Sequence, residues 1–359
     1  MEKSGKGLCI TLAALLCSAC GGVSSHSAVG QLSRGLIGQN GVFLNGMDWN
    51  GVWLNGSEWN GVFLNGYDFN GVYLNGLDWN GIELKGSSVS GVEVRGTVLE
   101  GFLADGTAVR GEGFIGAEFD VHLRNEASVR LRIDNIRRHP DPKHEDVLLY
   151  SISAPGNNGE RVSICYSADG SPAEATVVAG RWDLATGTKI SSSPKYASFA
   201  CIGVGAIAKC VIMGYKPWRS VGGVSLEDRH QACTRMVRAD YCGDGTPHTV
   251  NGTPIDVYDG IGVQAPDTNW PVDAEWGPNG ALCVNNPRSA NPEEPVPACI
   301  AERGLRRSDC GELTDGTFQY GGLLANKYLS HGKFQPVAGA SRDDGQPEEA
   351  LSAALRDAP

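Results

Sequence analysis

Residues 41–80 read GVFLNGMDWNGVWLNGSEWNGVFLNGYDFNGVYLNGLDWN. A Gly stands at every fifth position of this stretch, and the same spacing continues without a gap as far as Gly116. Each of the early Gly residues follows an Asn directly, and a large apolar residue stands two positions before it. A repeat of five fits neither an α-helix, with its period of about 3.6 residues, nor a free strand, with its period of about two. Self-similarity at a fixed period is typical of a solenoid.

The run resembles the pentapeptide-repeat family, in which each five-residue unit forms one side of a right-handed quadrilateral β-helix. On that template the apolar residue two before each Gly points inward. Asn and Gly form the corner, where Gly tolerates a positive φ. The 16 units between residues 41 and 116 make about four coils when stacked as a solenoid. The resemblance therefore predicts a mainly β chain with a β-helix over residues 37–120.

The outward positions of this template alternate between aromatic and acidic residues. The aromatic ones are Phe43, Trp53, Phe63 and Tyr73, and the acidic ones are Asp48, Glu58, Asp68 and Asp78. Exposed aromatic ladders are unusual on an idle surface, and we expect the aromatic face to bind an envelope protein or a glycan. The alternative is that the stacked aromatic side chains only stabilise the β-face.

The first twenty residues have the pattern of a secretory signal. Lys3 and Lys6 precede the apolar run LCITLAALL (8–16), which is too short to span a bilayer. Small residues then lead to Cys20, in a pattern that resembles a bacterial lipoprotein signal whose Cys is lipidated. We expect an outer-membrane lipoprotein of the cell envelope, anchored at Cys20, with residues 21–36 as a tether. Ordinary signal cleavage is the alternative, because the Leu of the usual motif stands four positions before this Cys rather than three.

Cysteine usage agrees with export. The chain has 11 Cys, and those after residue 160 are Cys165, Cys201, Cys210, Cys233, Cys242, Cys283, Cys299 and Cys310. In an oxidising compartment such an even set predicts up to four disulfides, with the connectivity left open. The alternatives are a zinc site at His230 and Cys233, or a nucleophile pair formed by the same two residues.

The second half of the chain contains three segments with distinctive sequences. The segments are FACIGVGAIAKCVIMGYKPW (199–218), HQACTRMVRADYCGDG (230–245) and NGTPIDVYD (251–259). Together they resemble the ADYC domain of myxobacterial-type envelope proteins, named for residues 239–242, over about residues 145–315. The resemblance implies an envelope location and upstream Gly-rich repeats, but no activity.

Local patterns predict an α+β region over residues 121–336, followed by a polar tail over 337–359. Alternating apolar residues predict a strand over 121–136. A capping box of Ser225 and Asp228 predicts a helix that begins at Ser225 and ends before Gly243.

The catalytic candidates are His230, Asp240 and Asp256, around the Gly-rich turns of residues 230–259. His230 stands on the apolar stripe of the predicted helix, which favours a buried structural His. Asp240 and Asp256, with Asp244 and Asp259, offer oxygen ligands for Ca²⁺. They lack the spacing of a calcium loop, and Asp in such turns commonly accepts hydrogen bonds from its own backbone. We predict no metal and no cofactor.

Composition and motifs together limit the function classes. The chain has 30 Lys+Arg against 41 Asp+Glu and a net charge of −11, which argues against a nucleic-acid partner. The sequence has no GxSxG, HExxH or phosphate-loop motif. We predict a non-enzymatic envelope lipoprotein for surface display, adhesion, or protein or glycan binding. The alternative is an exported hydrolase with a site near residues 230–259.

Overall fold

The computed structural model describes residues 37–40, 78–82, 89–122, 128–156, 160–167, 171–183, 185–249, 253–288 and 296–329. All of them belong to one compact unit, Arg34–Pro359. The predicted signal with Cys20, the tether, the aromatic positions Phe43, Trp53, Phe63 and Tyr73, and the polar tail lie outside the described residues. The described residues are mainly β, with three short α-helices, as the sequence predicts.

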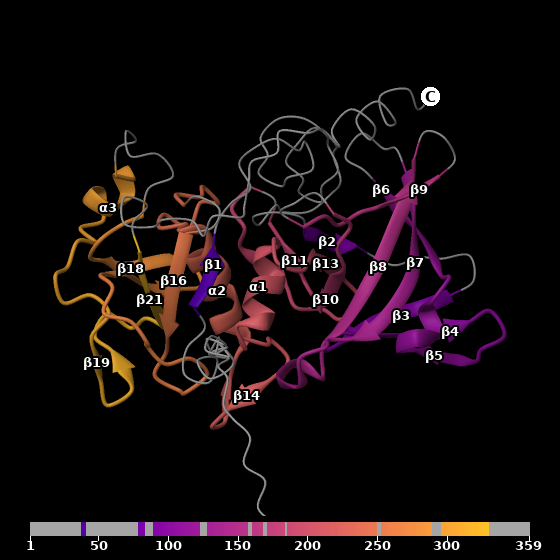
Figure 1. Ribbon diagram of the computed structural model, residues 1–359, viewed down its shortest axis with the longest axis horizontal. Helices are drawn as coiled ribbons and strands as arrows, with labels where there is room; N and C mark the ends of the chain where they lie inside the picture. Colours follow the sequence, from indigo (N-terminus) through magenta and orange to yellow (C-terminus); the bar gives the residue numbers. More distant parts are fainter. Residues whose placement is uncertain are drawn as a thin grey trace, which may run out of the picture. The chain divides into compact units, whose positions relative to one another are not determined.

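The larger sheet has seven antiparallel strands (Figure 1). Along its main path they are β2 (Asp78–Ile82), β13 (Ala197–Cys201), β10 (Ala175–Ala179), β8 (Leu148–Pro155), β7 (Ser128–Arg138) and β6 (Glu118–His122). The seventh, β9 (Arg161–Ser163), pairs with the end of β8. The strand predicted over 121–136 is therefore two strands, because the chain reverses between β6 and β7 and pairs them antiparallel.

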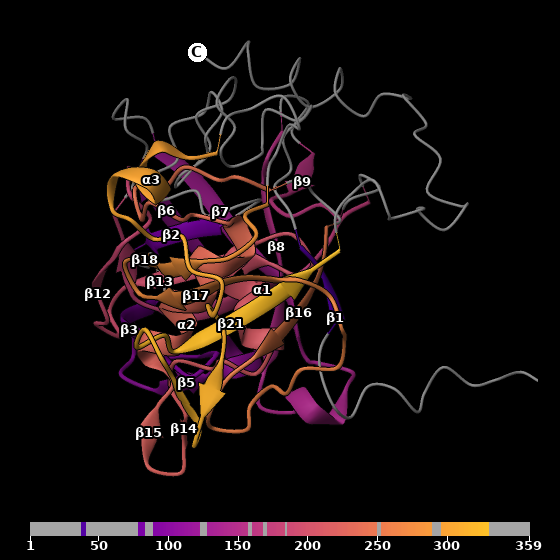
Figure 2. The same ribbon diagram turned by 90° about the vertical axis from the view of Figure 1, so that its left-hand side faces the viewer.

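The smaller sheet has five strands, also antiparallel (Figure 2). Their order is β1 (Ile37–Asn40), β16 (Thr253–Tyr258), β21 (Leu324–Tyr328), β17 (Val272–Gly277) and β18 (Gly280–Val284). β16 is buried along its whole length, in keeping with its position inside the sheet. Short strand pairs are formed by β11 (Arg181–Trp182) with β12 (Lys189–Ser191), β14 (Ser220–Val221) with β15 (Val224–Ser225), and β19 (Leu313–Thr314) with β20 (Thr317–Phe318).

Two α-helices lie between the sheets, α1 (Ala206–Ile212) and α2 (Glu227–Arg238). One hydrophobic core joins them to Leu149 and Val178 of the larger sheet and to Ile255 of the smaller one. Every residue of α2 from position 230 to its end is buried, which is typical of a helix covered on all sides. A third helix, α3 (Ala298–Glu302), follows β18. Among the described residues, no helix combines the length and the hydropathy needed to cross a membrane.

The helix α2 begins two residues later than predicted. Ser225 is the last residue of β15, and its hydroxyl accepts a hydrogen bond from the amide of Glu227 at 3.2 Å. The side chain of the actual N-cap residue, Leu226, makes no capping hydrogen bond. Ser225 thus supports the first turn from outside the helix, because the β14–β15 pairing already holds its backbone extended.

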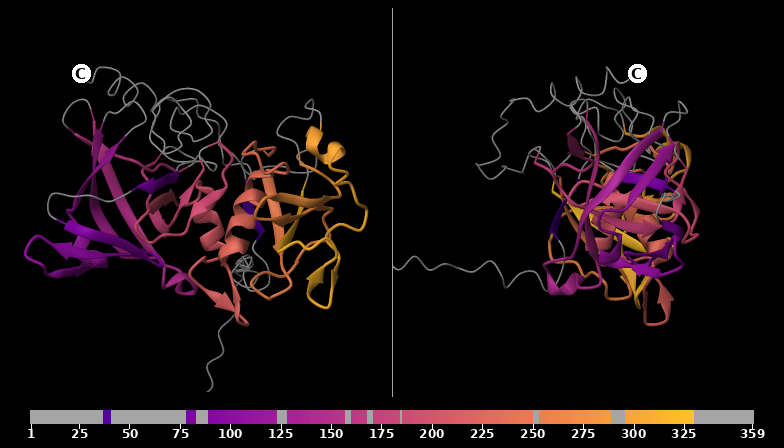
Figure 3. Two further views of the ribbon diagram at one scale, coloured as in Figure 1. Left: turned by 180° about the vertical axis from the view of Figure 1, so that it is seen from behind. Right: turned by 90° about the vertical axis from the view of Figure 1, so that its right-hand side faces the viewer.

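The other face of the larger sheet carries a second core. Figure 3 shows the purple strands of residues 89–110 beside the magenta strands of the larger sheet. Successive side chains of a strand point to opposite faces, so that Leu149 belongs to the first core while Leu148 and Tyr150 belong to the second. This face is covered by a small sheet of β3 (Val89–Arg95), β4 (Val98–Leu103) and β5 (Ala108–Arg110), with the 3-10 turn η2 (Gly111–Phe114). A second 3-10 turn, η3 (Pro142–His144), lies between β7 and β8.

The small sheet is made from the last units of the five-residue repeat. Its strands pair antiparallel, and the regularly spaced glycines shape it: Gly96 forms the β3–β4 turn with φ +66°, and Gly106 the β4–β5 turn with φ +84°. Gly91, with φ +59°, lies where the β3–β4 register shifts. Here the glycines supply hairpin turns and a bulge in place of the corners of a coil. Residues 41–77 are not described, and their β-helix stays a prediction.

Candidate functional site

A pocket of about 310 Å³ opens beside the N-terminal end of α2. Three segments that are distant in the chain form its walls: residues 188–192 around β12, the start of α2, and the turn between β17 and β18. Glu227, Asp228 and Gln231 line it from the helix, and Pro278 and Asn279 line it from the turn. The volume lies at the lower end of the range for small-molecule sites, about 300–1,000 Å³.

The pocket contains a charged pair. The carboxylate of Glu227 accepts hydrogen bonds from the ammonium of Lys189 at 3.1 Å and from the hydroxyl of Ser192. Lys189 also lies 5.3 Å above the ring of buried Trp182. Partial burial raises the pKa of Glu227, but the Ser192 hydrogen bond and the Lys189 charge outweigh it and hold that pKa below its usual range. Glu227 is therefore ionised at neutral pH and acts as a fixed acceptor.

Gln231 fixes the inner wall of the pocket. Its amide oxygen accepts a hydrogen bond from the indole of Trp182 at 2.7 Å, and its amide nitrogen donates to the carbonyl of Gly187 at 2.9 Å. These two bonds hold the segment between β11 and β12 against α2. The polar surface of the pocket is thus preorganised, which reduces the entropy that a ligand loses on binding.

The C-terminal end of α2 forms a tight corner. Ala239 is the C-cap and has left-handed backbone angles, φ 54° and ψ 42°, and its amide donates to the helix carbonyls of Arg235 and Met236. A non-glycine residue with positive φ is uncommon. Because Ala239 is fully buried, a small side chain suits the position.

Asp240 locks the corner to α2 through an ion pair. One of its carboxylate oxygens accepts from a guanidinium nitrogen of Arg235 at 2.6 Å and from the amide of Gly245 at 3.1 Å. The other guanidinium nitrogens donate to the carbonyl of Pro278 at 3.1 Å and to the hydroxyl of Thr188 at 2.8 Å. The Arg235–Asp240 pair therefore positions two walls of the pocket, the segment around Thr188 and the turn at Pro278.

Tyr241 joins the corner to the smaller sheet. Its ring stacks on Trp276 with centroids 5.1 Å apart, and its hydroxyl donates to Asp273 at 2.6 Å. Asp273 also accepts from Arg288 at 2.7 Å and from Asn326 at 3.1 Å. All of these side chains are buried. Burial raises the pKa of Tyr241, with the Asp273 charge acting in the same direction, so the hydroxyl stays protonated as a donor.

The eight cysteines of the C-terminal half form four disulfides, which confirms the prediction from cysteine parity. The pairs are Cys165–Cys201, Cys210–Cys233, Cys242–Cys299 and Cys283–Cys310. Cys210–Cys233 joins α1 to α2, and Cys242–Cys299 joins the corner to α3. Since Cys233 is bridged, its sulfur is neither a zinc ligand nor a nucleophile in this state.

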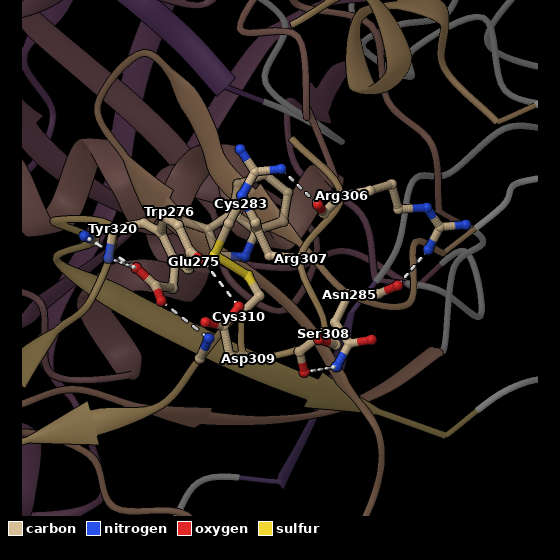
Figure 4. The surroundings of a disulfide bond; sticks show 12 residues. Glu275, Trp276, Cys283, Asn285, Arg306, Arg307, Ser308, Asp309, Cys310 and Tyr320 are labelled. Atoms are coloured by element: carbon tan, nitrogen blue, oxygen red, sulfur yellow. Dashed lines mark hydrogen bonds between the residues drawn. A yellow bond between two sulfur atoms is a disulfide. The ribbon is translucent and has the colours of Figure 1, made fainter. Parts of the chain in front are cut away.

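Among the described residues, one group brings three metal-type ligand side chains within 4.8 Å of one another: Glu275, Cys283 and Cys310 (Figure 4). The two sulfurs are bonded to each other and so are not thiolate ligands. The Glu275 carboxylate accepts hydrogen bonds from the backbone amides of Gly311, Tyr320 and Gly322. Burial raises the pKa of Glu275. The group holds the loop around β19 and β20 against β17.

Residues 111–290, half of the chain, match the family described as the ADYC domain. The chain belongs to the ADYC domain family. The matched interval contains the corner Ala239–Cys242 and starts and ends earlier than the expected interval, 145–315. No curated protein and no solved structure is significantly similar to the chain.

In this ADYC domain the three catalytic candidates belong to separate arrangements. His230 is completely buried within α2, with one ring nitrogen 3.3 Å from the carbonyl oxygen of Ile207. Asp240 is paired with Arg235, as described above. Asp256, on β16, accepts from the amides of Asp267 and Thr268 and from the Thr268 hydroxyl. None of the hydrogen bonds or ion pairs in the described part of the chain joins two of the three.

The acidic turn residues hold their own loops. Asp259 accepts from the amides of Ile261, Val263 and Gln264 and from the hydroxyl of Tyr215. Asp244 accepts from the amide of Thr246. These are the local hydrogen bonds that Asp commonly makes in turns.

Sequence reasoning missed the pocket residues of the ADYC domain. Glu227 and Asp228 carry a weak signal, because acidic residues in the first turn of a helix are expected for any helix. Lys189 and Asn279 are separated from them by about 40–50 residues of chain and stand in no recognisable motif. Only the pairing of β11 with β12 and the turn after β17 bring them to α2.

Stability of the ADYC domain is expected to fall in mild acid because of His230. Burial, helped by the charge of Lys189, lowers the pKa of His230 to about 3. The unfolded chain, with a His pKa of about 6.5, therefore binds a proton that the folded chain excludes. The contribution of neutral His230 to the free energy of unfolding is present in full above pH 6.5 and is lost as pH falls toward 3. It amounts to about 2 kcal/mol between pH 7 and pH 5.

Urea melts at pH 7, 6 and 5 measure how steeply the free energy of unfolding changes with pH, and His230→Gln is expected to make this slope smaller. The comparison uses the change with pH and is independent of any general destabilisation by the substitution. Equal slopes for the two proteins would show that His230 is not the group concerned.

The corner of the ADYC domain also requires a glycine directly after Cys242. Gly243 has φ +70°, and a Cβ there lies 2.0 Å from the carbonyl oxygen of Asn279. We expect Gly243→Ala to lower the free energy of unfolding by about 2–5 kcal/mol, from backbone strain and overpacking together. Gly304→Ala is the matched control, because Gly304 has φ +58° but no atom within 4 Å of a Cβ. Denaturant melts measure both variants. An equal loss in the free energy of unfolding for Gly243→Ala and Gly304→Ala would contradict the close approach of Gly243 to the carbonyl of Asn279.

Proposed function

We propose that this ADYC protein is a non-enzymatic, exported envelope protein that is held to the outer membrane by a lipid on Cys20. Its ADYC domain binds an envelope glycan in the pocket beside α2. The observation that carries the proposal is the character of the pocket. Carboxylate, amide, hydroxyl and ammonium groups line it together. Such a mixture of donors and acceptors suits the hydroxyl groups of a sugar.

The electrostatics of the pocket support binding over hydrolysis. Glycoside hydrolysis commonly needs one carboxyl group with a raised pKa as the general acid. The pKa of Glu227 is instead lowered, mainly by its hydrogen bond from Ser192 and by Lys189 against the effect of burial. Glu275, whose pKa is raised by burial, is occupied by backbone amides and does not line the pocket.

Four disulfides support the proposed export, because such bonds persist in oxidising compartments. The lipid anchor is tested by metabolic labelling with a palmitate analogue. The wild-type protein is expected to carry the label in the membrane fraction, and Cys20→Ala is expected to carry none. An unlabelled wild-type protein released in soluble form would contradict the anchor and leave the pocket proposal standing.

Glycan binding is tested by titrating the mature protein with soluble peptidoglycan fragments and with envelope oligosaccharides. Asp228→Ala and Asn279→Ala, on the exposed rim of the pocket, are expected to weaken binding at least tenfold, about 1.4 kcal/mol. Glu302→Ala, an exposed acidic residue at the end of α3, is the control and is expected to leave binding unchanged. Equal affinities for all variants would overturn the site. Release of new reducing ends would favour the hydrolase alternative.

A further inference from the structure

The outer edge of β13 is covered by a strand from the repeat. β13 pairs with β10 on one side and with β2 on the other, and β2 is the last strand of the larger sheet. The Cα partners are Asp78 with Ala200 and Trp79 with Phe199, followed by a register shift before Ile82 and Ala197. Without β2, the outward amides and carbonyls of β13 would form an unpaired edge, which promotes aggregation.

The sequence of β2 recurs upstream. β2 reads DWNGI, and residues 48–52 read DWNGV, residues 58–62 EWNGV and residues 68–72 DFNGV. A strand added at a sheet edge is held mainly by main-chain hydrogen bonds. Gly-rich strands specify their register weakly. Each of the three upstream units can therefore make the pairing that β2 makes.

We propose that the outer edge of β13 is a strand-acceptor site, occupied in exchange by these four units of the same chain, with β2 as the major occupant. Residues 83–88 connect β2 to β3, and each upstream unit lengthens this connection by ten residues. Loop-closure statistics then favour β2 over the units at 68–72, 58–62 and 48–52 by about fourfold, ninefold and fifteenfold. The repeat thereby keeps the edge covered whenever one unit detaches. This arrangement competes with the β-helix expected from the sequence for residues 41–77.

Proline substitution tests the exchange, because two successive prolines remove two adjacent amide donors, one of which faces β13, and so disrupt strand pairing. The first variant is Trp79→Pro/Asn80→Pro. The second carries the same double substitution in all four units, at residues 49–50, 59–60, 69–70 and 79–80. The control carries it only at residues 69–70. Hydrogen–deuterium exchange of residues 197–201 is measured in the full mature chain, and exchange of residues 273–277 on β17 reports whether the domain is folded.

The exchange rate of the β13 amides is expected to rise about threefold in the first variant, because the remaining units take over. It is expected to rise at least tenfold further in the four-unit variant, and by less than about 1.5-fold in the control. Equal rises in the first and the four-unit variants would show a unique pairing and overturn the proposal. Uniform protection of residues 41–77 in the wild type would overturn it in favour of a β-helix. A dimer by native mass spectrometry, lost in the four-unit variant, would assign the strand to a second copy and overturn the intramolecular exchange.

Discussion

Replacing Asp273 with alanine is expected to lower the free energy of unfolding by about 3–5 kcal/mol, the usual cost of breaking a buried ion pair by removing one partner. Asp273 is completely buried, and its carboxylate accepts hydrogen bonds from Tyr241, Arg288 and Asn326. Its loss leaves the Arg288 guanidinium, which is 1% exposed, without a counter-charge. Guanidinium chloride melts with the disulfides intact measure the effect.

A double-mutant cycle separates the ion pair from general packing. Asp273→Leu/Arg288→Met removes both charges and is expected to destabilise less than the sum of the two single substitutions, because neither charge is left unpaired. Asp244→Ala, at an exposed acid in the turn after the corner, is expected to stay within about 0.5 kcal/mol of the wild type. A loss of less than 1 kcal/mol for Asp273→Ala would contradict the buried network.

Removal of the Cys242–Cys299 bridge is expected to cost about 4 kcal/mol. This disulfide closes the longest loop of the four, with a sequence separation of 57. On the chain-entropy account, a longer closed loop restricts the unfolded chain more and so stabilises the folded one more. The double variant Cys242→Ala/Cys299→Ala is compared with the wild type by urea melts under non-reducing conditions.

The single variant Cys242→Ala is the control, since it also breaks the bridge and is expected to lose a similar amount. Intact-mass measurement after alkylation is expected to find no free thiol among the eight cysteines of the wild-type domain and one in the single variant. Two free thiols in the wild type, or a loss below 1 kcal/mol in the double variant, would show that the bridge is absent.

The ADYC corner could be predicted from the sequence as a motif, but its side-chain contacts could not. The sequence pointed to residues 239–242 as a family signature and to Cys242 as a disulfide residue. It did not show that Asp240 pairs with Arg235 or that Tyr241 donates to Asp273, 32 positions away. These partners depend on how α2 meets the smaller sheet, which no local pattern encodes.

The role of residues 216–219 could not be predicted from the sequence either. Lys216 and Arg219 both donate to the carboxylate of Asp146 in the larger sheet's β7–β8 connection. The backbone carbonyl of Asp146 accepts from the hydroxyl of Thr97, which lies in the β3–β4 turn, at 3.0 Å. This network ties the end of the repeat run to the ADYC domain through residues about 50–70 positions apart in the chain, a separation that turn and periodicity signals do not span.

The sequence by itself determined those features that depend on local chemistry or on counting. The resemblance of the five-residue repeat predicted a mainly β chain, alternation predicted the strands near residues 121–136, and an even number of cysteines predicted up to four disulfides. From Gly91 to Gly116, the glycines at every fifth residue have positive φ with the exception of Gly101. The apolar stripe of the predicted helix also favoured a buried His230, which the structure has. The tertiary structure alone decided which cysteines pair, that the His230 ring lies against the carbonyl of Ile207, and that Lys189, Glu227 and Asn279 share one pocket. The physical reason is that backbone preferences act over a few residues, whereas burial and pocket formation depend on which distant segments meet when the sheets close over α1 and α2.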